Sequence, residues 1–147
     1  MAAGRFGKND KVDVLAKLPL FARCSRRELG RIADICVEEE KKAGSVLTHE
    51  GQAGGVAFVI VEGDAEVRQG RRVLGSVGPG EVIGELALID GRPRSASVHA
   101  TTDLRVLEIS SDDFSTLLDD MPHFTRNLLV SLSLRIRQMD EHWKAEL

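Results

Sequence analysis

Two opposite charges, Glu85 and Arg94, stand nine residues apart in the segment GELALIDGRPRSA at 84–96, which is otherwise rich in Leu, Ala, Ile and Gly. Taken singly, each would be a solvated charge on a surface turn, because Glu and Arg are rarely buried without a partner. Together they suit one ligand, since a guanidinium can donate to two phosphate oxygens while a carboxylate accepts from a sugar hydroxyl. The pair therefore predicts a site for an anion that carries a hydroxyl, with 86–89 as its apolar wall.

Other chemistries lack their residues. The histidines have no partner at metal-ligand spacing, and they stand at His49, His99, His123 and His142. The glycines of GPGEVIG at 78–84 do not match the spacing of a dinucleotide-binding fingerprint. No GxxxxGK[ST] loop and no GxSxG motif is present. We therefore expect neither an enzyme nor a metal site.

Length and composition favour one globular domain over 1–147. The 147 residues are 42% hydrophobic and 29% charged, with a net charge of −3. An acidic balance predicts no nucleic-acid binding by this chain alone, and no apolar run approaches the roughly 20 residues of a membrane span. We expect a cytoplasmic protein in which Cys24 and Cys36 are reduced, with a disulfide as the alternative.

The elements that must position Glu85 and Arg94 are predominantly strands. Eleven of the fourteen glycines lie from Gly44 to Gly91, between short apolar runs, as in a β region with tight turns. Strands are predicted at 45–49, 56–61, 64–69, 72–77, 95–100 and 104–109. About eight strands favour a jelly roll or small barrel.

Helices are predicted on both sides of this β region. Ser25 and Glu28 form a capping pair at the start of a helix over 25–36. A shorter helix is expected from about Asp10 to Lys17, ending before Pro19, and another at 111–119.

A long helix is predicted after Pro122. Its apolar stripe has spacings of four, four, four, three and four, and consists of Phe124, Leu128, Leu132, Ile136, Met139 and Trp143. Such a helix can pack on its own barrel or pair with a second copy in a homodimer. The spacing drifts from a strict heptad, so both alternatives stay open.

With these elements in place, the chain resembles the family of cyclic nucleotide-binding domains, which includes sensor domains of protein kinase A regulatory subunits, gated channels and the catabolite activator protein. GELALIDGRPRSA is similar to the family's phosphate-binding cassette. Further matching segments follow in the family's order: LAKLPLF at 15–21, FVIVEGDAEV at 58–67, VGPGEVIGE at 77–85 and LEISSDDF at 107–114. Two positions depart from the family, Gln52 and Ile83, where Asp and Phe are common.

The resemblance implies a fold that is mainly β with flanking helices: an eight-stranded jelly-roll barrel with N-terminal helices and a long C-terminal helix. The N-terminal helices would occupy 1–40, the barrel 41–109, and hinge and lid helices 110–147. It also implies that Glu85 binds a ribose 2′-hydroxyl and Arg94 a cyclic phosphate. The remaining implied contacts are Gly84, Leu86, Ala87, Ser95 and Ala96.

For the ligand, the resemblance implies cyclic AMP, because Ser95 follows the cassette arginine where members that prefer cyclic GMP tend to have Thr; cyclic GMP stays an alternative. The long helix would cover the base through Gln138, Met139 and Asp140, or through Trp143, which could equally pack or dimerise. Ligand binding would shift the helices at 110–147 and so act as a signal. The downstream effector is open, as is whether the chain is a stand-alone sensor or part of a larger regulator, and the alternative function is a degenerate domain that serves only as an interaction module.

Overall fold

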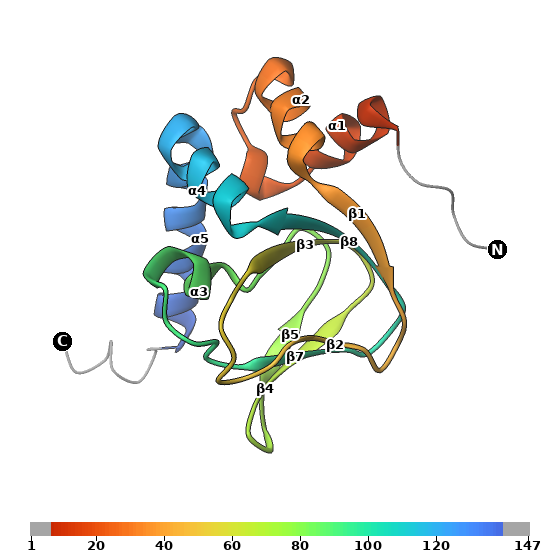
Figure 1. Ribbon diagram of the computed structural model, residues 1–147, viewed down its shortest axis with the longest axis vertical. Helices are drawn as coiled ribbons and strands as arrows, with labels where there is room; N and C mark the ends of the chain where they lie inside the picture. Colours follow the sequence, from red (N-terminus) through yellow and green to blue (C-terminus); the bar gives the residue numbers. More distant parts are fainter. Residues whose placement is uncertain (1–6, 140–147) are drawn as a thin grey trace.

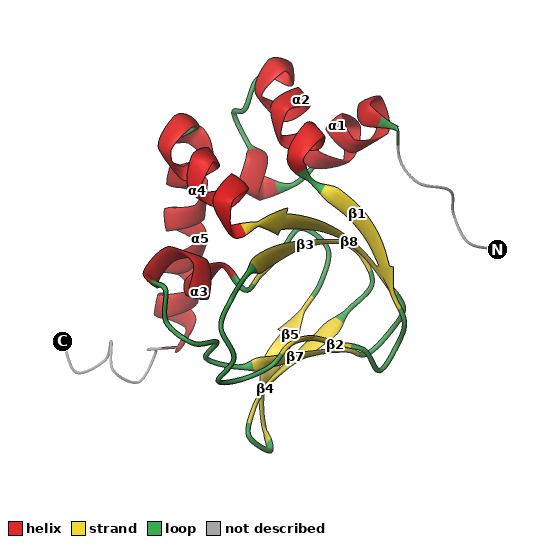
Figure 2. Ribbon diagram, in the orientation of Figure 1, coloured by secondary structure: helices red, strands yellow, loops and turns green. Residues whose placement is uncertain are grey.

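The computed structural model describes residues 7–139, in which two antiparallel sheets face each other and helices pack at one side (Figures 1 and 2). The strands are β1 (Val37–Lys41), β2 (Val46–Thr48), β3 (Val56–Glu62), β4 (Ala65–Gln69), β5 (Arg72–Val77), β6 (Val82–Ile83), β7 (Ser97–Ala100) and β8 (Leu104–Ser110). The helices are α1 (Lys8–Ala16), η1 (Pro19–Phe21), α2 (Arg26–Ile35), α3 (Glu85–Asp90), α4 (Ser111–Asp120) and α5 (Pro122–Met139).

The strands form two sheets rather than the predicted closed barrel. Hydrogen bonding gives the orders β1-β8-β3-β6 and β2-β7-β4-β5, and within residues 7–139 no ladder joins the edge strands of one sheet to those of the other. Two of these edge strands are very short, since β6 has two residues and β2 has three and a register shift. The prediction of eight strands with flanking helices is confirmed, and the prediction of closure was wrong.

Strand β1 lies partly in the segment that was predicted to be helical up to residue 40. Its sequence, VEEEK, is too polar to predict a buried strand, yet it pairs with β8 in register from Val37 opposite Glu108 to Lys41 opposite Leu104. Glu38 is buried there because Arg105 of β8 lies beside it, with 3.6 Å between Nε and Oε2. The cross-strand ion pair explains how so charged a segment becomes part of the sheet.

Strand β3 separates two hydrophobic cores. Because side chains alternate across a strand, Ala57 and Val59 pack in the core beneath the helices, whereas Phe58 and Ile60 pack between the two sheets. Burial on both faces explains why VAFVIV is continuously apolar. Strand β3 is therefore an inner strand that packs against a hydrophobic core on each face.

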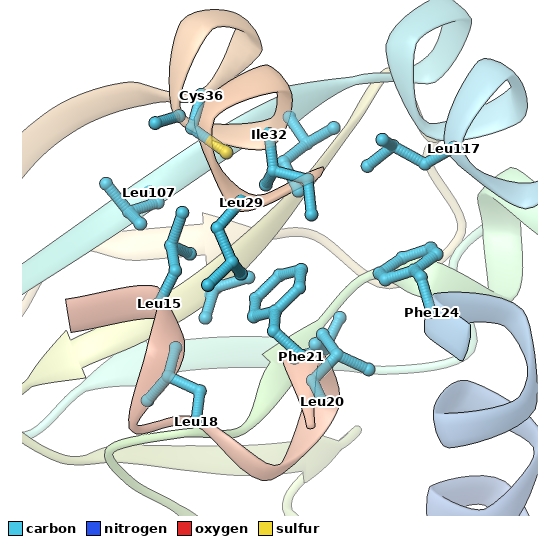
Figure 3. Packing of buried hydrophobic residues seen from close by; sticks show 14 of the residues in the cluster. Leu15, Leu18, Leu20, Phe21, Leu29, Ile32, Cys36, Leu107, Leu117 and Phe124 are labelled. Carbon is cyan, nitrogen blue, oxygen red and sulfur yellow. The ribbon is translucent and has the colours of Figure 1, made fainter. Parts of the chain in front are cut away.

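The core on the helix side holds the beginning of α5. Phe124 stacks on Phe21 with ring centroids 5.7 Å apart (Figure 3). The Phe124 ring also meets the Phe114 ring edge-on, with centroids 5.8 Å apart. The side-chain amide of Asn127 donates to the carbonyl oxygens of Leu20 and Ala22 at 3.0 and 2.7 Å. These contacts fix the first half of α5 against η1 and α4.

The predicted stripe along α5 is only partly buried. Phe124 and Leu128 are buried and Leu132 is half-buried, but Ile136 is 58% exposed. The inner face of the helix rotates away from Ile136, so Arg135 takes the position near the rest of the molecule. The side chains of Met139 and Trp143, which end the predicted stripe, lie outside the described residues.

Candidate functional site

A cavity of about 350 Å³ lies where β6, α3 and the segment before β7 meet the second half of α5. Its volume is within the range of small-molecule sites. All seven residues predicted to bind the ligand line this cavity: Gly84, Glu85, Leu86, Ala87, Arg94, Ser95 and Ala96. Thus, the structure brings the whole predicted set together around one space.

Helix α3 is held between two left-handed glycines. Gly84 precedes it with φ of 85° and Gly91 follows it with φ of 70°, a conformation that disfavours residues with a Cβ. A Cβ on Gly84 would also run into the Arg94 guanidinium, so glycine is required twice over at this position. On the other side of α3, Gly54 lets Ala87 approach, since a Cβ there would lie 2.7 Å from the Ala87 Cβ.

The backbone of Arg94 is anchored by the turn before β3. Its amide donates to the Gln52 carbonyl oxygen and its own carbonyl oxygen accepts from the Gly51 amide, both at 2.8 Å. Gln52, the predicted departure from the family, thus contributes through its backbone. Arg94 is therefore fixed at the cavity wall by main-chain contacts that do not depend on its side chain.

Arg94 is only 8% exposed, and within residues 7–139 its guanidinium donates hydrogen bonds to backbone oxygens alone. Nη2 donates to the Val56 carbonyl oxygen at 2.8 Å and Nη1 to that of Gly84 at 3.3 Å. No described residue places a carboxylate in an ion pair with it. Burial lowers the pKa of Arg94, and the attraction of Glu85 opposes that effect. A buried cation whose charge is not paired in this way is suited to an anion.

Glu85 is the most deeply buried charge of the cavity, at 1% exposure. Its Oε1 atom forms an ion pair with Nη1 of Arg135, and Nη2 of the same guanidinium donates to the Val82 carbonyl oxygen at 3.1 Å. Arg135 belongs to α5 and also lines the cavity. An element far along the chain therefore supplies the cation that compensates Glu85.

Arg135 is the site residue that the sequence reasoning missed. A signal was present, because Arg135 follows the buried residues Phe124 and Leu128 at spacings of eleven and seven, which place all three on one helix face. An arginine on a buried stripe indicates a carboxylate or another anion nearby.

The predicted base lid is not settled by these contacts. Gln138 is exposed and does not line the cavity. The Met139 side chain, Asp140 and Trp143 lie outside the described residues. Contacts of the lid with a base therefore stay a prediction.

Two further searches concern residues 7–139 only. No helix in this range is long and apolar enough to cross a membrane. No group of three or more potential metal ligands occurs in the same part of the chain.

Comparison with known proteins gives a consistent result. The family model described as "Cyclic nucleotide-binding domain" matches residues 38–121. The chain is 41% identical over 113 residues to a cAMP-dependent protein kinase regulatory subunit of Mycosarcoma maydis, covering 71% of this chain and 22% of that protein. It is 36% identical over 109 residues to a cyclic nucleotide-gated potassium channel of Mesorhizobium japonicum, covering 74% of this chain and 30% of that protein.

Among solved structures, the catabolite activator protein of Thermus thermophilus superimposes with a TM-score of 0.77 at 26% identity, covering 86% of this chain and 62% of that one. The chain spans less than a third of the length of the two relatives above.

Proposed function

Because this chain belongs to the family of cyclic nucleotide-binding domains, we propose that its cavity binds cyclic AMP and that the domain acts as a regulatory sensor rather than as an enzyme. The observation that carries the proposal is Arg94, a buried guanidinium without an ion pair among the described residues, which lines the same cavity as Glu85. The phosphate would lie on Arg94, and the ribose 2′-hydroxyl would donate to Glu85.

The charges favour a cyclic phosphate over an open one. A 3′,5′-cyclic phosphate carries one negative charge and leaves the 2′-hydroxyl free, so it uses one arginine and one acceptor. A 5′-phosphate is dianionic near neutral pH and would bring the second charge close to the Glu85 carboxylate. We therefore expect discrimination against 5′-AMP.

The choice of cyclic AMP over cyclic GMP depends on two observations. Ser95 follows Arg94, as in family members that prefer cyclic AMP, and it lines the cavity. The relative with 41% identity is named as a cAMP-dependent regulatory subunit.

The signal would leave the domain through its C-terminal helices. We propose that the nucleotide favours one arrangement of α4 and α5 against the sheets, and that this difference in affinity between two arrangements is the output. The hydrogen exchange of residues 111–139 should then differ with and without saturating cyclic AMP.

A second copy of the chain is the partner that we propose for the outer side of α5. Four apolar side chains are at least half exposed there: Leu129, Val130, Leu134 and Ile136. Burying such a face is favourable by roughly 25 cal/mol per Å². Sedimentation of the wild type and Leu134→Glu tests this, since a monomeric wild type contradicts the dimer.

The test of the ligand is thermal unfolding with cyclic AMP, cyclic GMP or 5′-AMP. A ligand at 100 times its dissociation constant adds about 2.7 kcal/mol of stability, which for a chain of this size raises the midpoint by roughly 5 to 10 °C. We expect cyclic AMP to give the largest increase, and Arg94→Ala to abolish it. If neither cyclic nucleotide raises the midpoint, the domain is the degenerate interaction module instead.

A further inference from the structure

The ion pair between Arg135 and Glu85 joins the end of α5 to the cavity. Its role in ligand binding depends on whether the ligand displaces Arg135 from Glu85. Glu85 is the residue proposed to receive the ribose hydroxyl, so the argument here rests on the proposed function. Arg135 could compete with the hydroxyl for Glu85 or could hold Glu85 in place for it. The burial and charge of these groups distinguish the two cases.

Burial of the carboxylate argues against displacement. Glu85 is 1% exposed, whereas the side chain of Arg135 is 38% exposed. An ionised carboxylate in such a place needs a cation, because an unpaired buried charge is strongly destabilising. A hydroxyl donates one hydrogen bond but brings no charge, so it cannot replace the guanidinium.

The charge of the cavity supports the same conclusion. Five charged residues of the described part of the chain line it: Glu85, Asp90, Arg92, Arg94 and Arg135. Three cations and two anions sum to +1, which matches a monoanionic cyclic phosphate. Without Arg135 the sum would be zero, and the bound ligand would leave one negative charge uncompensated beside Glu85.

The carboxylate also has room for both partners. Arg135 uses Oε1, and no described residue donates a hydrogen bond to Oε2. A carboxylate offers about four acceptor positions on its two oxygens. The guanidinium is also held by the Val82 carbonyl oxygen, two residues before Gly84. Arg135 therefore contacts both β6 and α3, the two elements that Gly84 connects.

We propose that Arg135 is a positioning residue of the ligand site: it stays paired with Oε1 of Glu85 when the nucleotide is bound and presents Oε2 to the ribose hydroxyl. Because the first half of α5 is fixed by Phe124 and Asn127, this ion pair is the connection through which occupancy of Glu85 reaches the second half of the helix. The hydrogen bond from the ligand to Glu85 and the ion pair from α5 to Glu85 then stabilise each other.

The experiment compares Arg135→Gln with Arg137→Gln, which removes the same charge from the same helix at an exposed position. Titration calorimetry measures the affinity of each variant for cyclic AMP and for 2′-deoxy cyclic AMP, which lacks the hydroxyl. We expect Arg135→Gln to weaken the binding of cyclic AMP at least tenfold. The binding of 2′-deoxy cyclic AMP should weaken by a clearly smaller factor, because only cyclic AMP has the hydroxyl that donates to Glu85. Arg137→Gln should bind both as the wild type does.

Two additional variants control for a loss of folding. Arg135→Lys keeps the charge and should recover part of the cyclic AMP affinity, and Glu85→Gln should make a further change at 135 nearly neutral. In hydrogen exchange, cyclic AMP should protect residues 132–139 in the wild type but not in Arg135→Gln.

Three outcomes overturn the proposal. Unchanged or tighter cyclic AMP binding by Arg135→Gln would make Arg135 a bystander or a competitor. Equal losses for the two nucleotides would show that Arg135 acts by charge alone and not through Glu85. If the wild type itself binds neither nucleotide, the proposed function fails and this inference fails with it, which separates that case from the first two.

Discussion

Two places in the molecule bury a carboxylate and an arginine, and they do so in opposite ways. In the sheet pair, Glu38 and Arg105 come from neighbouring strands, are 7% and 6% exposed, and lie 3.6 Å apart. In the cavity, Arg94 is as deeply buried at 8%, but among the described residues its guanidinium donates only to carbonyl oxygens, and Glu85 is paired with a residue of another element. The first arrangement compensates its charges within the fold, whereas the second leaves Arg94 without an ion pair among residues 7–139, which suits the proposed phosphate.

The difference teaches how to recognise a binding site among buried charges. Burial alone does not distinguish Arg105 from Arg94. What distinguishes them is where the compensating charge comes from and whether a cavity adjoins the guanidinium. A site that leaves a cation uncompensated gives up stability for function.

The largest expected effect is a difference in the free energy of unfolding, measured without ligand, between variants that lack Arg105 and variants that lack Arg94. Arg105→Ala removes the cation that lies beside the buried Glu38 carboxylate, and it should lower the free energy of unfolding by about 3 kcal/mol or more. Arg94→Ala removes a costly buried charge together with two hydrogen bonds to carbonyls, so the net change should stay below about 1 kcal/mol. Urea denaturation of both variants measures this.

If Arg94→Ala is destabilised as much as Arg105→Ala, the contrast between the two sites is lost. Arg105→Lys provides a milder control that keeps a cation beside Glu38. It should fall between the wild type and Arg105→Ala.

A smaller effect concerns the two glycines that bound α3. Ala at either position must adopt a left-handed backbone and should cost roughly 1 to 2 kcal/mol of stability. Gly91 has nothing within 4 Å of an added Cβ, whereas at Gly84 the Cβ would displace the Arg94 guanidinium. Gly84→Ala should therefore also weaken cyclic AMP, and Gly91→Ala should not. Comparable affinities in calorimetric titrations would contradict the assigned position of Arg94.

The smallest effect is a pH dependence that arises at Glu108 on β8, an inner strand of its sheet. Burial and the neighbouring Glu39 carboxylate raise the pKa of Glu108, while Lys41 partly opposes this. A carboxyl whose pKa is higher in the folded state binds protons more tightly there, so its contribution to stability falls as pH rises above about 4.5.

Glu108→Gln removes this contribution. Relative to the wild type, the variant should gain stability between pH 4.5 and 7, which thermal unfolding at several pH values can measure. A difference that does not change with pH would show that Glu108 does not titrate in this way.

Much of the fold followed from local signals in the sequence. VAFVIV at 56–61 predicted β3 because a strand buried on both faces is continuously apolar. Ser25 and Glu28 predicted the start of α2 because their reciprocal capping is local, and the structure contains it. Glycines and short apolar runs likewise located β2, β4, β5, β7 and β8.

The parts that could not be predicted depend on distant partners. β1 carries VEEEK and becomes a strand through the register of β8, and the two-residue β6 is too short for any periodicity to show. Closure of the sheets depends on edge pairing that no local pattern encodes.

The same division applies to the site. Glu85 and Arg94 were predictable because one short segment carries both, and a family resemblance supports their spacing. Arg135 is fifty residues from Glu85, and only the packing of α5 reveals that the two meet. The structure also shows that Ile136, rather than Arg135, is the residue that turns to solvent.

The central claim is that Arg94 is kept for the phosphate of a cyclic nucleotide, and a calorimetric titration of the chain with cyclic AMP tests it most directly. The account predicts one site per chain in the wild type and an affinity that falls by 30-fold or more in Arg94→Ala, about 2 kcal/mol at least. Arg105→Ala, titrated at a temperature where it is folded, should bind almost as the wild type does. Equal binding by the wild type and Arg94→Ala, or no binding by the wild type, would contradict the account.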